Sequence, residues 1–287
     1  MAISIASSFE SLKSNLEVTG LQGSTVSARQ QHVREALARK LTVIDSFLTG
    51  SYARHTMIAP LSEADIDVFV VLDPNYYKAG GFAELLDRVR AVLLETYPTT
   101  PRISRNGQAV TVTFSDFVVD VVPGFNRQGG GYLIPSTIEK KWISTDPKAH
   151  VQYMSELNDG HDGNLVPLIK MVKAWNRTNG NSIRSFYLEL LTARVLSGVV
   201  ISDFPSGCRY VFDKGREQVK FLIPDPTGLG SDVRGLAGDT KLQEAIKRFE
   251  EAYQQAAQAE YFASQYRLAD SIGVWRQLFG QYFPAYG

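Results

Sequence analysis

The segment from Gly50 to Leu72 constrains the fold of this chain more than any other part of the sequence. It begins with Gly50-Ser51-Tyr52 and, after a short loop, continues as Asp65-Ile66-Asp67 and an apolar run to Leu72. Apart from Asp67, residues 66–72 are apolar and mostly β-branched, which predicts a buried strand. Asp65 and Asp67 are two residues apart, so their side chains project from one face of that strand. Neighbouring carboxylates repel each other unless a cation lies between them, and Mg²⁺ is the simplest hard dication that binds oxygen ligands.

The residues before this strand predict a phosphate site. Residues 42–49 read as a strand, and Gly50-Ser51 ends it and opens a helical turn. Glycine lets the backbone approach a phosphate closely, and the first N–H groups of a helix attract anions. Either half alone has an ordinary explanation, since Gly-Ser is common in turns and Asp-x-Asp is common at solvated strand ends. Together they resemble the DNA polymerase beta-type nucleotidyltransferase superfamily, whose motif is Gly-Ser followed by Asp-x-Asp.

A third acid interrupts a second apolar strand pattern. Residues 117–123 are apolar except for Asp120. The ordinary interpretation is an acid at a strand end or in a bulge, but a site that already holds two acids favours Asp120 as the third carboxylate. Asp116 is the competitor on the same strand face. We expect Asp116 to be exposed, because it follows Ser115 at a turn.

Composition restricts the function classes. The chain has 30 basic and 30 acidic residues among 287 and a pI near 6.9. That balance argues against constitutive binding of nucleic acid, which usually brings a basic excess. The single cysteine, Cys208, excludes an internal disulfide and a cysteine-based metal site, and fits a reducing compartment. With no apolar run of 18 residues and no signal peptide at residues 1–8, we expect a cytoplasmic protein without a membrane partner.

The patterns along the chain predict an α+β protein. Helices are expected at 7–17, 26–41 and 82–97, and a strand at 108–114. From about residue 146 onward the pattern is helical, with further helices at 185–197, 238–260 and 262–280. We therefore expect N-terminal helices and a nucleotidyltransferase core with a mixed sheet over residues 1–145, packed on a helical domain over residues 146–287. A cleft between the two would hold nucleotides.

One expected helix, around residues 165–177, has two distinct faces. An apolar stripe is formed by Leu165, Leu168, Ile169, Val172 and Trp175. Lys170, Lys173 and Arg177 are spaced to share the opposite, basic face. Such a face is usually solvated, but beside an anionic ligand it would bind phosphates. Ser185 opens the next helix, where its ordinary role would be that of an N-cap.

Further motifs make the resemblance closer than superfamily level. In order along the chain they are Gly50-Ser51-Tyr52, Asp65-Ile66-Asp67, Val119-Asp120-Val121-Val122-Pro123, Gly131-Tyr132-Leu133-Ile134-Pro135, Trp142 with Pro147 and His150, Lys173-Ala174-Trp175, Ser185-Phe186-Tyr187-Leu188-Glu189, Asp225-Pro226, and Trp275-x-x-Leu278-Phe279-Gly280-x-x-Phe283-Pro284. Over about residues 25–287 the chain resembles the bacterial cGAS/DncV-like nucleotidyltransferases (CD-NTases). His55 departs from the small residue expected in the first motif.

The resemblance implies a cyclic oligonucleotide synthase of an antiphage signalling system (CBASS), which makes a cyclic di- or trinucleotide from nucleoside triphosphates, ATP among them. It implies that Asp65, Asp67 and Asp120 hold two Mg²⁺ ions, with Mn²⁺ as a possible substitute. The residues matching Ser51, Lys173 and Ser185 would contact the donor phosphates, beside the turn at Gly50. The helical half would correspond to the OAS-like C-terminal region.

The resemblance also implies a partner encoded in the same operon, which activates the synthase or joins its C-terminus to a target. Gly287 is then a candidate for the conjugated end, and its ordinary interpretation is a frayed terminus. Two rival functions are an RNA-tailing or aminoglycoside-type nucleotidyltransferase and a catalytically silent nucleotide-sensing module. The neutral charge argues against an RNA substrate, and the presence of all three acids argues against a silent module.

Overall fold

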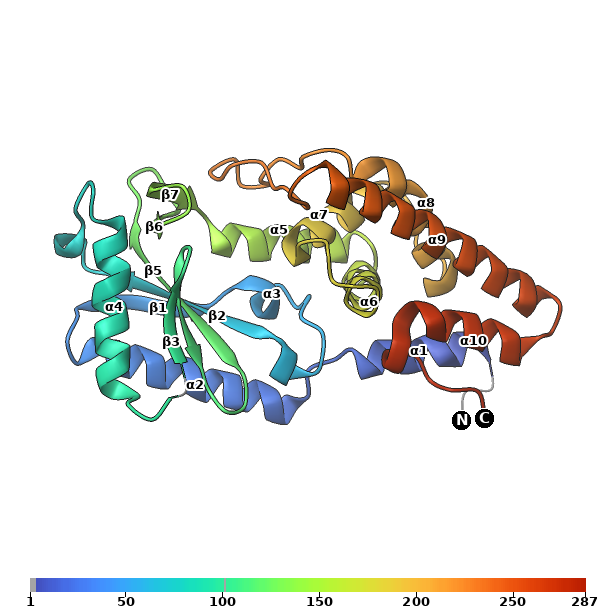
Figure 1. The fold of residues 1–287 in the computed structure, drawn as a ribbon, viewed down its shortest axis with the longest axis horizontal. Coiled ribbons are helices and arrows are strands. Elements are labelled where there is room, and N and C mark those ends of the chain that lie inside the picture. The colour runs from blue at the N-terminus through green and yellow to red at the C-terminus, as the bar shows by residue number, and fades with distance from the viewer. Residues whose placement is uncertain (1–3, 101) are drawn as a thin grey trace. The chain divides into compact units, whose positions relative to one another are not determined.

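The computed structural model describes residues 4–100 and 102–287, which divide into two compact units (Figure 1). The sheet unit contains residues 18–154 and 225–231, and the helical unit contains residues 4–17, 155–224 and 232–287. The sequence predicted domains at 1–145 and 146–287. The units differ from these domains because the first helix belongs with the later helices, and because residues 146–154 and 225–231 belong with the sheet.

The sheet unit is built on a mixed β-sheet. Its strands lie in the order β1 (Val43–Leu48), β2 (Asp65–Leu72), β5 (Val118–Asn126), β4 (Ala109–Thr113) and β3 (Arg102–Asn106), with β6 (Tyr132–Ser136) pairing with both β5 and β7 (Lys141–Thr145). The β2–β5 pair is parallel and the other described pairs are antiparallel. Strand β2 begins one residue before the predicted strand at 66–72, whereas β3, β6 and β7 were not predicted as strands.

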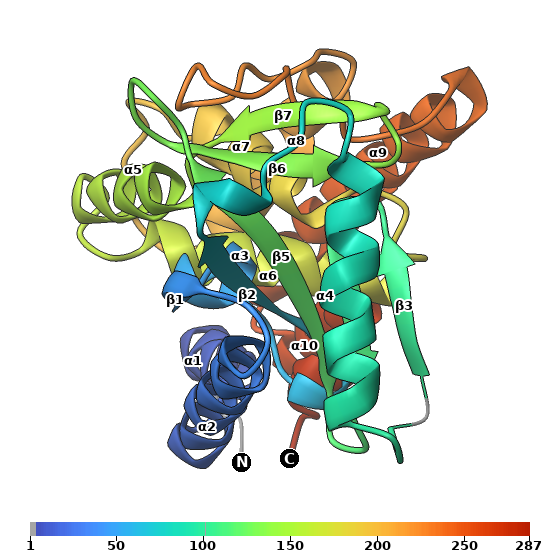
Figure 2. The ribbon, with the colours of Figure 1, turned by 90° about the vertical axis from the view of Figure 1, so that its left-hand side faces the viewer.

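The two faces of β2 are covered differently. Ile66 and Val68 belong to the core that packs under the helices α2 (Gly20–Ala38) and α4 (Phe82–Thr96). Figure 2 shows α4 lying across the sheet. On the opposite face, Phe69 packs with Tyr132 of β6. Burial on both faces explains the long apolar run, and the two acids occupy the start of the strand.

The helical unit gathers helices from both ends of the chain. They are α1 (Ile5–Asn15), α6 (Leu165–Thr178), α7 (Ser185–Val195), α8 (Phe204–Gln218), α9 (Asp239–Ser264) and α10 (Leu268–Phe279), while α5 (Pro147–Asp159) begins in the sheet unit and ends here. In Figure 1, α8 and α9 lie side by side and α1 lies beside α10. Trp175 of α6 packs against Phe212 and Phe249, which come from α8 and α9.

Most predicted helices lie within a few residues of their observed bounds. The largest differences are at α2, predicted over 26–41 and observed over Gly20–Ala38, and at α10, predicted over 262–280 and observed over Leu268–Phe279. Leu41 follows the helix and is still buried in the core. Helix α8 was not predicted. Among the described residues, no helix combines the length and the apolar character that a membrane crossing requires.

Candidate active site

Three acids reach one face of the sheet from two neighbouring strands. Asp67 on β2 and Asp120 on β5 are register partners in the parallel pair. Partners on adjacent strands project from the same face, and Asp65, two residues before Asp67, shares that face. The pairing of separate strands therefore brings together the three acids that the sequence singled out.

The electrostatics of these acids reflect their closeness. The side chain of Asp65 is exposed, yet the surrounding protein removes part of its hydration, and this desolvation raises the pKa of its carboxyl. Desolvation also raises the pKa of Asp120, and the charge of Asp65 adds to the rise. A hydrogen bond of 2.5 Å from Thr111 Oγ1 to Asp120 Oδ1 acts in the opposite direction. The two carboxylates thus repel each other across the strand pair.

The donor set fits a hard dication in chemistry but is not assembled as a metal site. Carboxylate oxygens are the ligands that Mg²⁺ prefers. In the described part of the chain, however, no group of three or more His, Cys, Asp or Glu side chains is arranged to hold a metal ion as it stands. The Asp120 carboxylate is engaged with Thr111, and that of Asp67 lies against Gly50. The acids therefore share a face without converging on one point.

The backbone of Gly50 lies directly against the Asp67 carboxylate. Its φ of +63° is favoured only for glycine, and a Cβ at this position would lie 1.8 Å from Asp67 Oδ2. The turn is tied to β2 because the Thr49 N–H donates to the Asp67 carbonyl at 2.9 Å. The helix α3 (Gly50–Ala53) contains Ser51, whose carbonyl accepts hydrogen bonds from the N–H groups of Thr56 and Met57. The predicted strand, Gly-Ser turn and helix are all present.

Asp116 lies outside this group of acids. It is exposed and forms an ion pair of 2.9 Å with Arg29. Desolvation raises the pKa of Asp116, but the hydrogen bond and the charge of Arg29 outweigh it and leave the pKa below its usual value. Its place at an exposed turn is the one expected from the sequence.

Lys173 and Ser185 lie in the helical unit, in surroundings that differ from the prediction. The predicted basic face of α6 is not solvated, because the helix is buried on nearly all sides: Lys170 and Lys173 are only 5% and 8% exposed. Lys173 donates to Glu189 at 2.9 Å. Ser185 is the first residue of α7 rather than its N-cap, and its hydroxyl is 3.5 Å from Glu189 Oε1. Lys173 and Ser185 therefore share a partner.

The chain matches one protein family over residues 3–158, the Second Messenger Oligonucleotide or Dinucleotide Synthetase domain. The chain belongs to this family.

Relatives and solved structures agree with this family. A cyclic AMP-AMP-AMP synthase from Acinetobacter is 28% identical over 256 residues, which are 84% of this chain and 73% of the relative. The structure of Escherichia coli MS115-1 CdnC with ATP has a TM-score of 0.78 at 17% identity and covers 98% of this chain and 99% of its own. CdnC in complex with HORMA-deltaN has a TM-score of 0.77 at 17% identity, with 98% of each chain covered.

These findings confirm the class predicted from the sequence. As a member of the second-messenger synthetase family, the chain is a CD-NTase, a nucleotidyltransferase that makes a cyclic oligonucleotide in CBASS defence. The solved structures confirm the α+β fold with a polymerase beta-like core.

Sequence reasoning missed two residues that contact the predicted site residues of this synthetase. Thr111 was part of an alternating strand pattern, and only the pairing of β4 with β5 brings it to Asp120. Glu189 was part of the quoted Ser-x-x-x-Glu motif, but nothing in the motif indicated that it contacts Lys173.

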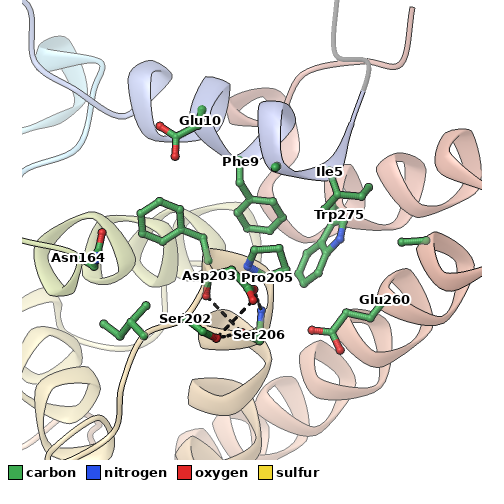
Figure 3. Close-up of a pocket in the computed structure, with 14 residues that line it drawn as sticks. Ile5, Phe9, Glu10, Asn164, Ser202, Asp203, Pro205, Ser206, Glu260 and Trp275 are labelled. Carbon is green, nitrogen blue, oxygen red and sulfur yellow. Dashed lines mark hydrogen bonds between the residues drawn. The ribbon is translucent and has the colours of Figure 1, made fainter. Parts of the chain in front are cut away.

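A cavity of about 650 Å³ lies elsewhere, inside the helical unit (Figure 3). Its walls come from α1, α8, α9 and α10 and include Phe9, Asp203, Glu260 and Trp275. None of the predicted site residues lines it, so its position does not bear on the acids of the sheet.

Proposed function

We propose that this synthetase joins nucleoside triphosphates, ATP among them, into a cyclic di- or trinucleotide at the acids of β2 and β5. Asp65, Asp67 and Asp120 would hold two Mg²⁺ ions, or Mn²⁺ in their place. The observation that carries this proposal is the register pairing of Asp67 with Asp120, with the Gly50 turn against the Asp67 carboxylate. The name of the Acinetobacter relative and the CdnC structure with ATP support ATP as a substrate.

Each residue has a stated task in this reaction. Gly50, with no side chain, lets a triphosphate approach the backbone of the turn, and Ser51 offers a hydroxyl to it. Lys173 and Ser185 contact the phosphates of the donor nucleotide. Asp120 accepts the proton of the attacking 2′ or 3′ hydroxyl. Metal ions bound by the three acids would lower the pKa of that hydroxyl and offset the charge on the departing pyrophosphate.

The test is incubation with all four nucleoside triphosphates and Mg²⁺, followed by nuclease mapping and mass spectrometry of the product. We expect a cyclic product without any added polymer or drug, and its loss when EDTA removes the metal. Asp65→Asn and Asp67→Asn should abolish product, with at least about a thousandfold loss of rate, because each replaces a charged metal ligand by a neutral one. Circular dichroism should show both variants folded. Turnover equal to that of the unaltered enzyme in either variant refutes the site.

Partner proteins form the second part of the proposal. The complex of CdnC with HORMA-deltaN supports regulation by a protein partner. We expect the partner of this chain to be encoded in the same operon. Residues 285–287 are exposed, which would leave Gly287 accessible to a conjugating enzyme. Mass spectrometry of the protein co-expressed with its operon neighbours tests this, and a wholly free C-terminus contradicts the proposed conjugation.

We place the enzyme in the cytoplasm, where its triphosphate substrates are made.

A further inference from the structure

Glu189 is a fully buried carboxylate that the proposed reaction does not use. It lies on α7, one turn after Ser185, and its side chain is 0% exposed. Its neighbours Leu188 and Leu190 are buried too. An ionised carboxylate in such surroundings is costly unless charged and hydrogen-bonding partners offset the loss of water. The partners of Glu189 therefore indicate its task.

One oxygen of Glu189 faces both residues proposed to contact the donor phosphates. Oε1 accepts a hydrogen bond of 2.9 Å from Lys173 Nζ and lies 3.5 Å from the hydroxyl of Ser185. Lys173 comes from the middle of α6 and Ser185 from the first turn of α7. A single buried atom thus links two groups that the sequence separates by twelve positions.

A second lysine on the same helix provides a comparison. Lys170, one turn before Lys173, is also buried, and it pairs with Glu17 at 2.7 Å. The side chain of Glu17 is 51% exposed, so this pair keeps its contact with water. Two lysines on one helix therefore have carboxylate partners at similar distances, one partner at the surface and the other wholly in the core.

Stability alone does not account for the buried pair. Replacing a buried ion pair by apolar residues of similar volume is often neutral or stabilising. What a core carboxylate does supply is a fixed position, because its own side chain is held by packing on every side. Lysine has a long flexible stem, and a hydrogen bond to such a carboxylate restricts where its ammonium group lies.

We propose that Glu189 is a positioning residue for the triphosphate end of the donor nucleotide. It holds the ammonium group of Lys173 and the hydroxyl of Ser185 at fixed places, so that both meet the phosphates without rearrangement. Glu189 itself does not contact the nucleotide. The inference rests on the proposed function, in which Lys173 and Ser185 bind phosphates.

The experiment compares Glu189→Gln with Glu17→Gln, which alters the partner of Lys170 instead. Initial rates of product formation are measured against nucleoside triphosphate concentration, and urea unfolding gives the stability of each variant. We expect Glu189→Gln to raise KM about tenfold and to change kcat by less than threefold, because the loss falls on phosphate binding. Glu17→Gln should leave both constants within twofold of the unaltered enzyme. A merely structural role would lower stability and leave KM unchanged.

The remaining outcomes are also decisive. If Glu189→Gln does not fold, Glu189→Asp keeps the charge but withdraws the carboxylate by one methylene, and we expect it to raise KM as well. A KM within twofold of the unaltered value in whichever variant folds overturns the proposal. Failure of both variants to fold overturns it too, since the carboxylate would then serve folding. An unaltered enzyme that makes no cyclic product contradicts the proposed function instead, so the two failures are distinct.

Discussion

At the scale of single residues, the site depends on how closely a backbone approaches a carboxylate. Gly50 has a positive φ, and any Cβ there would overlap the Asp67 carboxylate. We expect Gly50→Ala to lower the rate of product formation about a hundredfold or more, because displacing a reacting group by even 1 Å can cost that much. The measurement is the initial rate at saturating triphosphate.

Gly163→Ala is the matched control for this prediction. Gly163 also has a positive φ, of +77°, but nothing lies within 4 Å of its Cβ position. The control should lose about 1–2 kcal/mol of stability from backbone strain and keep its rate. Equal losses of rate in the two variants would show that backbone strain, rather than overlap with the Asp67 carboxylate, causes the loss in Gly50→Ala.

Single residues also show how much of the site could be predicted from the sequence. Asp67 and Asp120 were found because each interrupts an apolar strand pattern, and Asp65 because the two-residue period of a strand places it on the same face as Asp67. The bond from Thr111 to Asp120 depends on the register of two strands, which no local pattern specifies. The burial of Lys173 escaped prediction for a similar reason, since α6 is covered by α1, α7, α8 and α10, and its own pattern does not indicate this cover.

At the scale of elements, α8 shows why a helix can be missed. Its sequence contains Pro205, Gly207 and Gly215, which are poor helix formers. The structure explains the glycines by packing: a Cβ on Gly207 would lie 3.0 Å from Leu168, and one on Gly215 would lie 2.5 Å from Phe249. Close contact with α6 and α9 therefore selects residues that local propensity disfavours.

This packing gives a prediction with an internal control. Gly215→Ala should destabilise the protein by about 1–3 kcal/mol, because overpacking against Phe249 outweighs the gain in helix propensity. Gly273→Ala, within α10, meets nothing within 4 Å and should stabilise it by up to about 1 kcal/mol. Urea unfolding of the two variants measures both changes. Stabilisation by both would mean that α8 can shift away from Phe249 without loss.

Asp225, in the segment 225–231, should make the stability of the fold depend on pH. Asp225 lies 2.6 Å from His150 Nε2 and accepts hydrogen bonds from the Thr227 hydroxyl and the Gly230 N–H. Desolvation raises the pKa of Asp225, but these hydrogen bonds outweigh it and leave the pKa below its usual value. Because the folded pKa is the lower one, the bonds stabilise the fold above pH 4, and this contribution is lost as the pH falls through the folded pKa.

We therefore expect Asp225→Asn to cost about 1–3 kcal/mol at pH 7 and progressively less as the pH falls below 4. Urea unfolding of both proteins between pH 7 and pH 3 measures the difference. Parallel stability curves for the two proteins would contradict the assignment, since the variant would then have lost nothing that titrates.

At the scale of the whole molecule, the two ends of the chain fold into one helical unit. The sequence predicted a boundary near residue 145 because the pattern changes from mixed to helical there. It gave no sign that residues 4–17 belong with the last helices, since an amphipathic helix does not specify its partner. Phe9 on α1 makes edge contacts with Trp275 and Phe283, at centroid distances of 4.9 and 5.2 Å. Aromatic residues of the terminal Trp-Leu-Phe-Gly-Phe-Pro motif thus form part of the surface on which the first helix packs.

The packing of α1 against the last helices predicts that a change in α1 destabilises those helices. Phe9 is 1% exposed, and Phe9→Ala should cost about 3–5 kcal/mol because it leaves a cavity among the aromatic rings. Tyr266→Ala, at a side chain that is 93% exposed, should cost less than about 0.5 kcal/mol. Urea unfolding followed by tryptophan fluorescence measures both, since Trp175 and Trp275 lie in this unit. A loss below about 1 kcal/mol for Phe9→Ala would mean that the last helices hold together without α1.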